Sequence, residues 1–128
     1  MDTQDKIVLI VEKDTGIANM IRAILGIVNV PVVHTQLGND ALKAIQTHNA
    51  GLIISEKELP DMTGYELLSF ARKNAATNQV PFIMLIDEQD KSYEKLDATL
   101  QADRYITKPF TARKVLDVVK EFIVYKGL

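Results

Sequence analysis

Charged side chains follow several short apolar runs of this sequence. Glu12 and Lys13 follow one run, Glu56 and Glu58 follow another, and Lys108 follows a third. Carboxylate groups can act as nucleophiles or hold a hard metal ion, and an ammonium group can balance their charge. If the runs are parallel strands of one open sheet, their carboxyl ends meet at one edge, where such sheets bind ligands. The sequence therefore places one candidate site at that edge.

Five short runs are typical of β-strands, and the first, third and fourth are continuously apolar, as in strands that are covered on both faces. They lie at residues 6–11, 31–35, 51–55, 81–86 and 103–107. Pro31 opens the second run, which predicts a strand that begins late or lies at an edge of the sheet.

Helical patterns separate these strands. Asp14 or Thr15 can cap the first helix, and Thr63 with Glu66 has the spacing of a capping box. Helices are expected from residue 14 or 15 to about 25, around 41–45, from 64 to about 74, around 93–100 and from 111 to about 125. Strands that alternate with helices pair in parallel through right-handed crossovers. We therefore predict a doubly wound α/β sandwich, with residues 1–128 forming a single domain.

Composition excludes several classes of function. The 128 residues carry a net charge of −2, whereas a nucleic-acid surface needs clustered lysine and arginine. The absence of cysteine excludes disulfides, thiolate nucleophiles and cysteine-based zinc sites. No apolar stretch approaches the roughly 20 residues of a membrane helix. We expect a cytoplasmic soluble domain without nucleic-acid or membrane partners.

Four motifs in this order and spacing resemble the receiver domain of two-component response regulators, over essentially the whole chain. The motifs are LIVEKD after the first strand, LIISEKELPDMTGYELL around the third, VPFIMLI at the fourth and YITKPF at the fifth. The resemblance implies a flavodoxin-like (βα)5 fold with a five-stranded parallel sheet in the order 2-1-3-4-5. It also implies protein partners in a phosphorelay.

The resemblance assigns positions within the candidate site. Receivers use an aspartate as phosphoacceptor where this chain has Glu56, and an acidic pair that holds Mg²⁺ where it has Glu12 and Lys13. The usual lysine is retained as Lys108. The backbone carbonyl of Glu58 stands where receivers supply a metal ligand.

Two further positions belong to the family's switch. The Ser or Thr that normally binds the phosphoryl oxygen is Ile86 here, and the aromatic residue three positions before Lys108 is retained as Tyr105. Ile86 has no hydroxyl group. A phosphorylated Glu56 therefore could not pull the end of the fourth strand inward as the family's switch does.

The differences from the family at Lys13, Glu56 and Ile86 predict a degenerate receiver. Lys13 puts an ammonium group where Mg²⁺ needs an oxygen ligand, so Mg²⁺ is not expected and Glu12, Glu56 and Glu58 are vestigial metal positions. The charges of Glu12, Lys13, Glu56 and Lys108 sum to zero without an ion. We expect Lys13 to pair with Glu56 and to lock the pocket.

The expected function is therefore non-enzymatic signalling by protein–protein interaction. The partner would be a histidine kinase, another receiver or an output domain, docked around Tyr105, Lys108 and the last helix. A homodimer could form through the face made by the fourth helix, fifth strand and fifth helix of the family.

Three alternatives stay open. Glu56 or a neighbouring residue could accept phosphate from a histidine kinase, or Glu56 could act as a permanent mimic of the phosphorylated aspartate. A flavodoxin-like cofactor binder is disfavoured, because no glycine-rich phosphate loop follows the first strand.

Overall fold

The computed structural model describes residues 6–89 and 101–123. Its elements are β1 (Ile7–Val11), α1 (Thr15–Ile27), β2 (Val32–Thr35), α2 (Gly38–Thr47), β3 (Ala50–Glu56), α3 (Gly64–Lys73), β4 (Phe82–Asp87), β5 (Arg104–Lys108) and α4 (Ala112–Val119). The helix expected around residues 93–100 lies outside the described residues.

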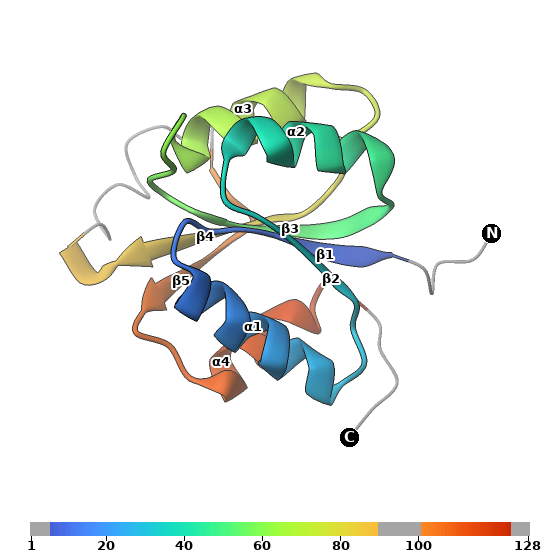
Figure 1. Cartoon of the computed structure of the whole chain (residues 1–128). Helices are drawn as coiled ribbons and strands as arrows, with labels where there is room; N and C mark the ends of the chain where they lie inside the picture. Colours follow the sequence, from blue (N-terminus) through green and yellow to red (C-terminus); the bar gives the residue numbers. More distant parts are fainter. Residues whose placement is uncertain (1–5, 90–100, 124–128) are drawn as a thin grey trace.

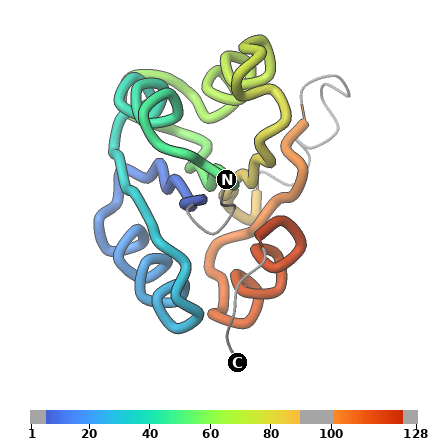
Figure 2. Tube along the Cα trace, turned by 90° about the vertical axis from the view of Figure 1, so that its right-hand side faces the viewer, coloured from blue at the N-terminus to red at the C-terminus, as the bar shows by residue number. Residues whose placement is uncertain are grey.

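The five strands form one parallel sheet in the order β2-β1-β3-β4-β5, which confirms the predicted topology. The strand that follows Pro31 lies at one edge of this sheet, as the proline indicated. Helices α1 and α4 cover one face and α2 and α3 cover the other (Figure 1). Figure 2 shows the same layers from the side, with α1 beside α4 and α2 beside α3.

The central strands β1, β3 and β4 are apolar up to their carboxyl ends, and both of their faces are buried. In β1, Val8 and Ile10 belong to the core under α1 and α4, whereas Leu9 and Val11 belong to the core under α2 and α3. Successive strand residues point to opposite faces of a sheet, so a continuous apolar run fills both cores. In these central strands, charged residues first appear at or directly after the carboxyl end.

Helix boundaries follow their capping signals. Asp14 caps α1, since its side chain accepts hydrogen bonds from the N–H groups of Gly16 and Ile17. Thr63 and Glu66 form the predicted capping box at the start of α3. These two caps fix the chain directly after β1 and after the loop that follows β3.

The last helix ends earlier than the expected boundary near residue 125. Helix α4 stops at Val119, and the N–H groups of Glu121 and Phe122 bond to carbonyls three residues back. Such bonds tighten the chain into turns. Ile123 is nevertheless buried, so the apolar pattern continued beyond the end of the helix.

Gly64 allows a close approach between α3 and the end of β3. A Cβ atom at this position would lie 2.5 Å from the carbonyl oxygen of Glu56 and 2.6 Å from the sulfur of the buried Met84. We predict that Gly64→Ala lowers the free energy of unfolding by about 1–3 kcal/mol, because backbone and core must shift.

Gly26→Ala is the matched control for this substitution. Gly26 also lies in a helix, but a Cβ atom there would meet no atom within 4 Å. This change should raise the free energy of unfolding by about 0.5–1 kcal/mol, because alanine restricts the unfolded chain. Urea denaturation measures both variants, and equal effects would contradict the close approach at Gly64.

Candidate functional site

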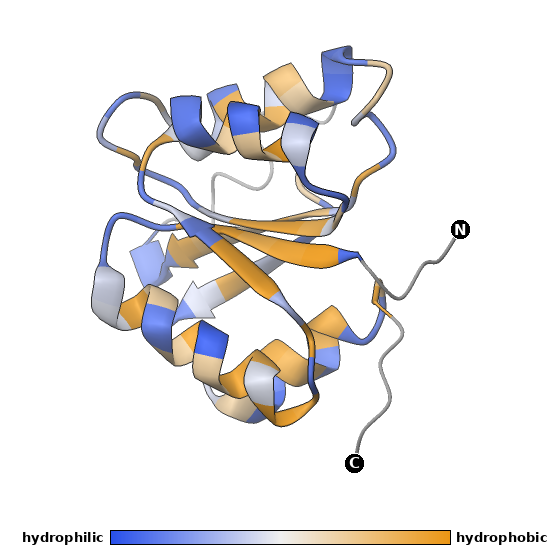
Figure 3. Ribbon diagram, turned by 45° about the vertical axis from the view of Figure 1, so that its right-hand side comes forward, coloured by the Kyte–Doolittle hydropathy of each residue, from blue (hydrophilic) through white to orange (hydrophobic). Residues whose placement is uncertain are grey.

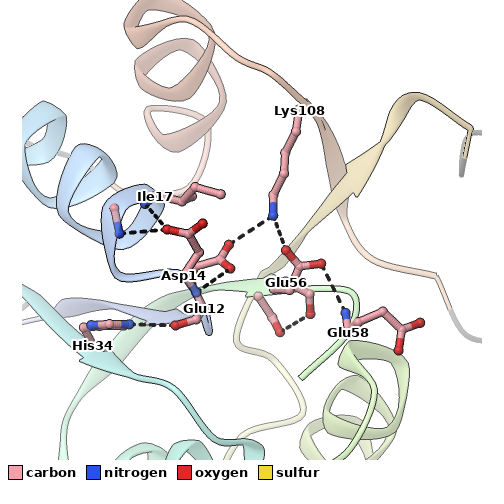
Figure 4. A network of polar contacts seen from close by, with 9 residues as sticks. Glu12, Asp14, Ile17, His34, Glu56, Glu58 and Lys108 are labelled. Carbon is pink, nitrogen blue, oxygen red and sulfur yellow. Dashed lines mark hydrogen bonds and ion pairs between the residues drawn. The ribbon is translucent and has the colours of Figure 1, made fainter. Parts of the chain in front are cut away.

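The carboxyl ends of β1, β3 and β5 bring three charged side chains together. Glu12 directly follows β1, Glu56 ends β3 and Lys108 ends β5. Figure 4 shows the ammonium group of Lys108 between the two carboxylates, and we call these three residues the EKE cluster. The cluster lies at the edge of the sheet at which the sequence placed the candidate site.

Lys108 contacts both glutamates of the cluster. Its Nζ donates a hydrogen bond to Oε1 of Glu56 and lies 3.3 Å from Oε1 of Glu12. The peptide bond that follows Lys108 is cis. One ammonium group therefore balances part of the charge of two carboxylates that come from different strands.

The backbone supplies the other hydrogen bonds of the carboxylates. Oε2 of Glu12 accepts from the N–H of Asp14 at 3.1 Å, and Oε2 of Glu56 accepts from the N–H of Glu58 at 3.2 Å. Oε1 of Glu12 is buried and accepts no hydrogen bond, although the ammonium of Lys108 lies within ion-pair distance. On its Oε1 side, Glu12 is thus held by the charge of Lys108 rather than by a hydrogen bond.

Because the cluster is buried, the loss of any one of its charges is costly in free energy. Glu12 is 0% exposed, Glu56 is 7% exposed and the side chain of Lys108 is 17% exposed. A buried ion that loses its partner costs several kcal/mol, because neither water nor another charge compensates it. The three side chains must therefore be treated as one unit.

The pKa values of Glu12 and Lys108 are both raised, but for different reasons. Desolvation raises the pKa of Glu12 above 4.5, against the hydrogen bond from the Asp14 N–H and the charge of Lys108. Desolvation acts to lower the pKa of Lys108, but its hydrogen bond to Glu56 and the two negative charges outweigh this and raise it above 10.5. Lys108 is therefore firmly charged, while Glu12 takes up a proton more readily than an exposed glutamate.

Lys13 does not pair with Glu56, and the prediction of that ion pair is wrong. Lys13 is exposed, and its backbone carbonyl accepts a hydrogen bond from the side chain of Gln36 at 3.2 Å. Lys108 takes the place beside Glu56 instead. Glu12 occupies the buried position after β1, which leaves the next residue, Lys13, at the surface. The EKE cluster consequently carries a formal charge of −1 rather than zero.

Glu58 contributes its backbone but not its carboxylate to the cluster. Its side chain is 57% exposed and pairs with Lys57 at 3.5 Å. Figure 4 shows the Glu58 carboxylate pointing away from the cluster. The resemblance assigns a role to the backbone carbonyl of Glu58. In the structure its N–H group donates a hydrogen bond to Oε2 of Glu56 instead.

Ile86 and Tyr105 lie on neighbouring strands beside the cluster. Ile86 is 1% exposed and belongs to the core under α2 and α3. Tyr105 is half-buried, and its hydroxyl accepts hydrogen bonds from the Tyr65 hydroxyl and the Ala102 N–H, both at 3.3 Å. The structure therefore connects Tyr105 to α3 and to the start of β5, through partners that the sequence did not reveal.

Two contacts around the site were not predicted from the sequence. Nε2 of His34 lies 2.9 Å from the carbonyl oxygen of Glu12, which ties the edge strand β2 to the end of β1. Asp61 accepts hydrogen bonds from the N–H groups of Gly38 and Asn39 at the start of α2, and these bonds lower its pKa. Hydrogen bonding between distant segments leaves no local pattern by which either residue could have been found.

The residues present do not fit a Mg²⁺ ion. Mg²⁺ requires a near-octahedral set of oxygen ligands. In residues 6–89 and 101–123, no group of three or more His, Cys, Asp or Glu side chains is arranged to hold a metal ion. The ammonium group of Lys108 lies between the two buried carboxylates, and Lys13 supplies no oxygen ligand from its side chain.

None of the helices in the described part of the chain is both long enough and apolar enough to span a membrane.

Comparisons with known proteins bear on the family and the fold of this chain. A family model described as the response regulator receiver domain matches residues 8–120. The regulatory protein VanRB of Enterococcus faecalis is 33% identical over 122 residues, which cover 94% of this chain and 53% of that protein. The transcriptional regulatory protein GltR of Pseudomonas aeruginosa is 28% identical over 123 residues, which cover 96% of this chain and 51% of that protein. The chain thus spans about half the length of these curated relatives.

A solved structure gives the same result for the fold. A crystal structure described as a putative response regulator from Chloroflexus aurantiacus superimposes with a TM-score of 0.85 at 28% sequence identity. The match covers 91% of this chain and 95% of that one. The likeness therefore extends over nearly the whole of both molecules.

Lys108→Met should destabilise the fold strongly and in a pH-dependent way. The variant leaves Glu12 and Glu56 buried without a counter-charge, which should cost about 3–5 kcal/mol at pH 7. The raised pKa of Glu12 means that its contribution to stability is present below 4.5 and lost as the pH rises through its folded-state pKa. The loss caused by Lys108→Met should therefore be smaller near pH 5 than at pH 8, as measured by urea denaturation.

Lys120→Met is the matched control. Lys120 is exposed and pairs with the exposed Asp117 at 3.6 Å, so its loss should cost less than about 0.5 kcal/mol at either pH. In the unaltered chain, Lys108 should stabilise the fold fully below pH 10.5 and lose this effect as the pH rises through its raised pKa. Equal costs for the two lysine variants would contradict the EKE cluster as a buried unit.

Proposed function

The chain belongs to the response regulator receiver domain family, and from this premise we propose that it is a receiver that signals without accepting a phosphoryl group. It is a non-enzymatic module of two-component signalling that acts by contact with other proteins. The EKE cluster is the observation that carries the proposal. In this cluster Lys108 pairs with Glu12 and with Glu56, and the exposed Lys13, at the position of the family's second acid, adds no carboxylate that could hold a metal ion.

The groups around Glu56 support this proposal. Phosphoryl transfer needs a nucleophile in line with the phosphorus and a metal that neutralises the transferred oxygens. Glu56 accepts a hydrogen bond from Lys108 at Oε1 and one from the N–H of Glu58 at Oε2, and these two contacts orient its carboxylate. Lys13 stands at the position of the family's second acid, and its exposed side chain supplies no oxygen ligand for a metal ion.

The positions of the family's switch support it as well. Ile86 is buried in the core and has no hydroxyl with which to bind a phosphoryl oxygen. Tyr105 already bonds to the hydroxyl of Tyr65. A modification at Glu56 would thus have no polar link from β4 to Tyr105.

The same contacts argue against Glu56 as a permanent mimic of phosphoaspartate. A mimic must present its negative charge to the switch, but Lys108 pairs with that charge inside the cluster. The alternative to our proposal is that Glu56 or a neighbouring residue accepts phosphate from a histidine kinase. Intact-mass measurement separates the two.

The partner that we propose is a histidine kinase, another receiver or an output domain. The face around Tyr105 and α4 offers charged and aromatic contacts: Arg104 pairs with Glu121 at 2.7 Å and lies 5.7 Å from the ring centre of Phe122. Surface pairs of this kind contribute to specificity and association rate more than to affinity.

Incubation with Mg²⁺ and acetyl phosphate should leave the mass of the chain unchanged. The reason is that Lys13 replaces the second acid of the pair that holds the metal ion and that the longer Glu56 replaces the aspartate nucleophile. Intact-mass spectrometry checks this result directly. A stoichiometric phosphoryl adduct would refute the proposed function.

Lys13→Asp combined with Glu56→Asp should restore part of the acceptor activity. The double change returns the acidic pair and shortens the nucleophile, while Lys108 keeps its place. The same mass measurement should then show a partial adduct in the presence of Mg²⁺. Lys13→Asp combined with Glu56→Asn is the control, and it should give none because it lacks the carboxylate. Failure of the double variant, with its fold intact by circular dichroism, would indicate that Ile86 blocks the reaction.

A further inference from the structure

Helix α1 exposes large apolar side chains to solvent. Met20 is 49% exposed and Ile27 is 57% exposed, and they are two of the four large hydrophobic residues that the described part of the chain leaves exposed. Together with the exposed Gly16 and Ala23 they recur at i, i+4, i+7 and i+11, which places all four on one face of the helix. We call these four residues the α1 stripe.

The α1 stripe is free of charge. The single charged residue of α1 is Arg22, and its guanidinium donates to the carbonyl of Val32 on the edge strand at 3.4 Å. Figure 3 accordingly shows fewer hydrophilic segments along α1 than along α2 and α3. An uncharged face suits a contact with an identical copy, because a twofold axis brings equivalent charges close together and makes them repel.

The order of residues in the stripe makes it complementary to itself. When two α1 helices cross antiparallel about a twofold axis, Gly16 of one copy meets Ile27 of the other and Met20 meets Ala23. Each large side chain then faces a small one, which is the arrangement that fills space without voids. A parallel arrangement would instead place Met20 against Met20 and Ile27 against Ile27.

We propose that the α1 stripe is a contact between two copies of this chain. The contact does not depend on whether Glu56 accepts a phosphoryl group, and it uses a face other than the one around Tyr105 and α4. A helix of 13 residues is about 20 Å long. Two such helices bury less than the roughly 800 Å² per partner of a standard interface, so the dimer should be weak.

Sedimentation equilibrium of the 128-residue chain tests this proposal. A monomer–dimer equilibrium should appear between roughly 10 µM and 1 mM. Ile27→Lys should weaken the dimer by about tenfold or more, because a twofold axis places the buried charge in the contact twice. Circular dichroism confirms that the variant is folded.

Phe70→Lys is the matched control. Phe70 is 53% exposed but lies on α3, on the other face of the sheet, and its change should alter dimerisation by less than about twofold. A chain that stays monomeric up to 1 mM would overturn the proposal. So would a dimer that is lost in Phe70→Lys or in Arg104→Glu but kept in Ile27→Lys. A monomer whose binding to a histidine kinase is lost in Ile27→Lys would assign the stripe to that partner instead.

Disulfide trapping tests the antiparallel register, and the chain has no cysteine that would interfere. Met20→Cys and Ala23→Cys chains are mixed and oxidised. The antiparallel crossing predicts that the mixed disulfide exceeds either symmetric one by about fivefold or more. Symmetric disulfides in excess would contradict the proposed register.

Discussion

The burial of Lys108 between Glu12 and Glu56 is the constraint around which the functional end of the molecule is organised. Each residue sits at the end of a different strand, so their attraction holds the ends of β1, β3 and β5 at fixed separations. Such a cluster is weak evidence for net stability, because desolvation offsets much of the attraction. The cluster instead favours one arrangement of the strand ends, since removing any one charge leaves another charge buried without compensation.

The rest of the fold provides the low-polarity setting that makes these charges matter. The central strands are apolar on both faces, and the helices cover both faces of the sheet. Polar groups near the cluster therefore come from backbone N–H groups at the ends of elements, such as those of Asp14 and Glu58. The short connection between β3 and α3 depends in turn on Gly64, which lets the helix lie against the Glu56 carbonyl.

Most of the fold could be predicted from sequence, because it follows from local patterns. Apolar runs, helical periodicity and the capping box at Thr63 and Glu66 determine where elements begin. The early end of α4 could not be foreseen, because Ile123 keeps the apolar period although the chain has left the helix. The strand ends predict that Glu12, Glu56 and Lys108 lie near one another, as they do in the structure. The choice of Lys108 over Lys13 as partner of Glu56 depends on which side chain a strand end buries. That choice is set by packing between segments far apart in the chain.

The EKE cluster also limits how this molecule could change state. A ligand shifts a conformational equilibrium only by the difference in its affinity for the two states. If the cluster takes neither a metal ion nor a phosphoryl group, the difference must come from a protein that binds one state better. Two surfaces then matter most: the face around Tyr105 and α4, and the α1 stripe, whose helix is capped by Asp14 only two residues from Glu12. A contact on that helix could thus act on the cluster through the Asp14 N–H that already holds Glu12.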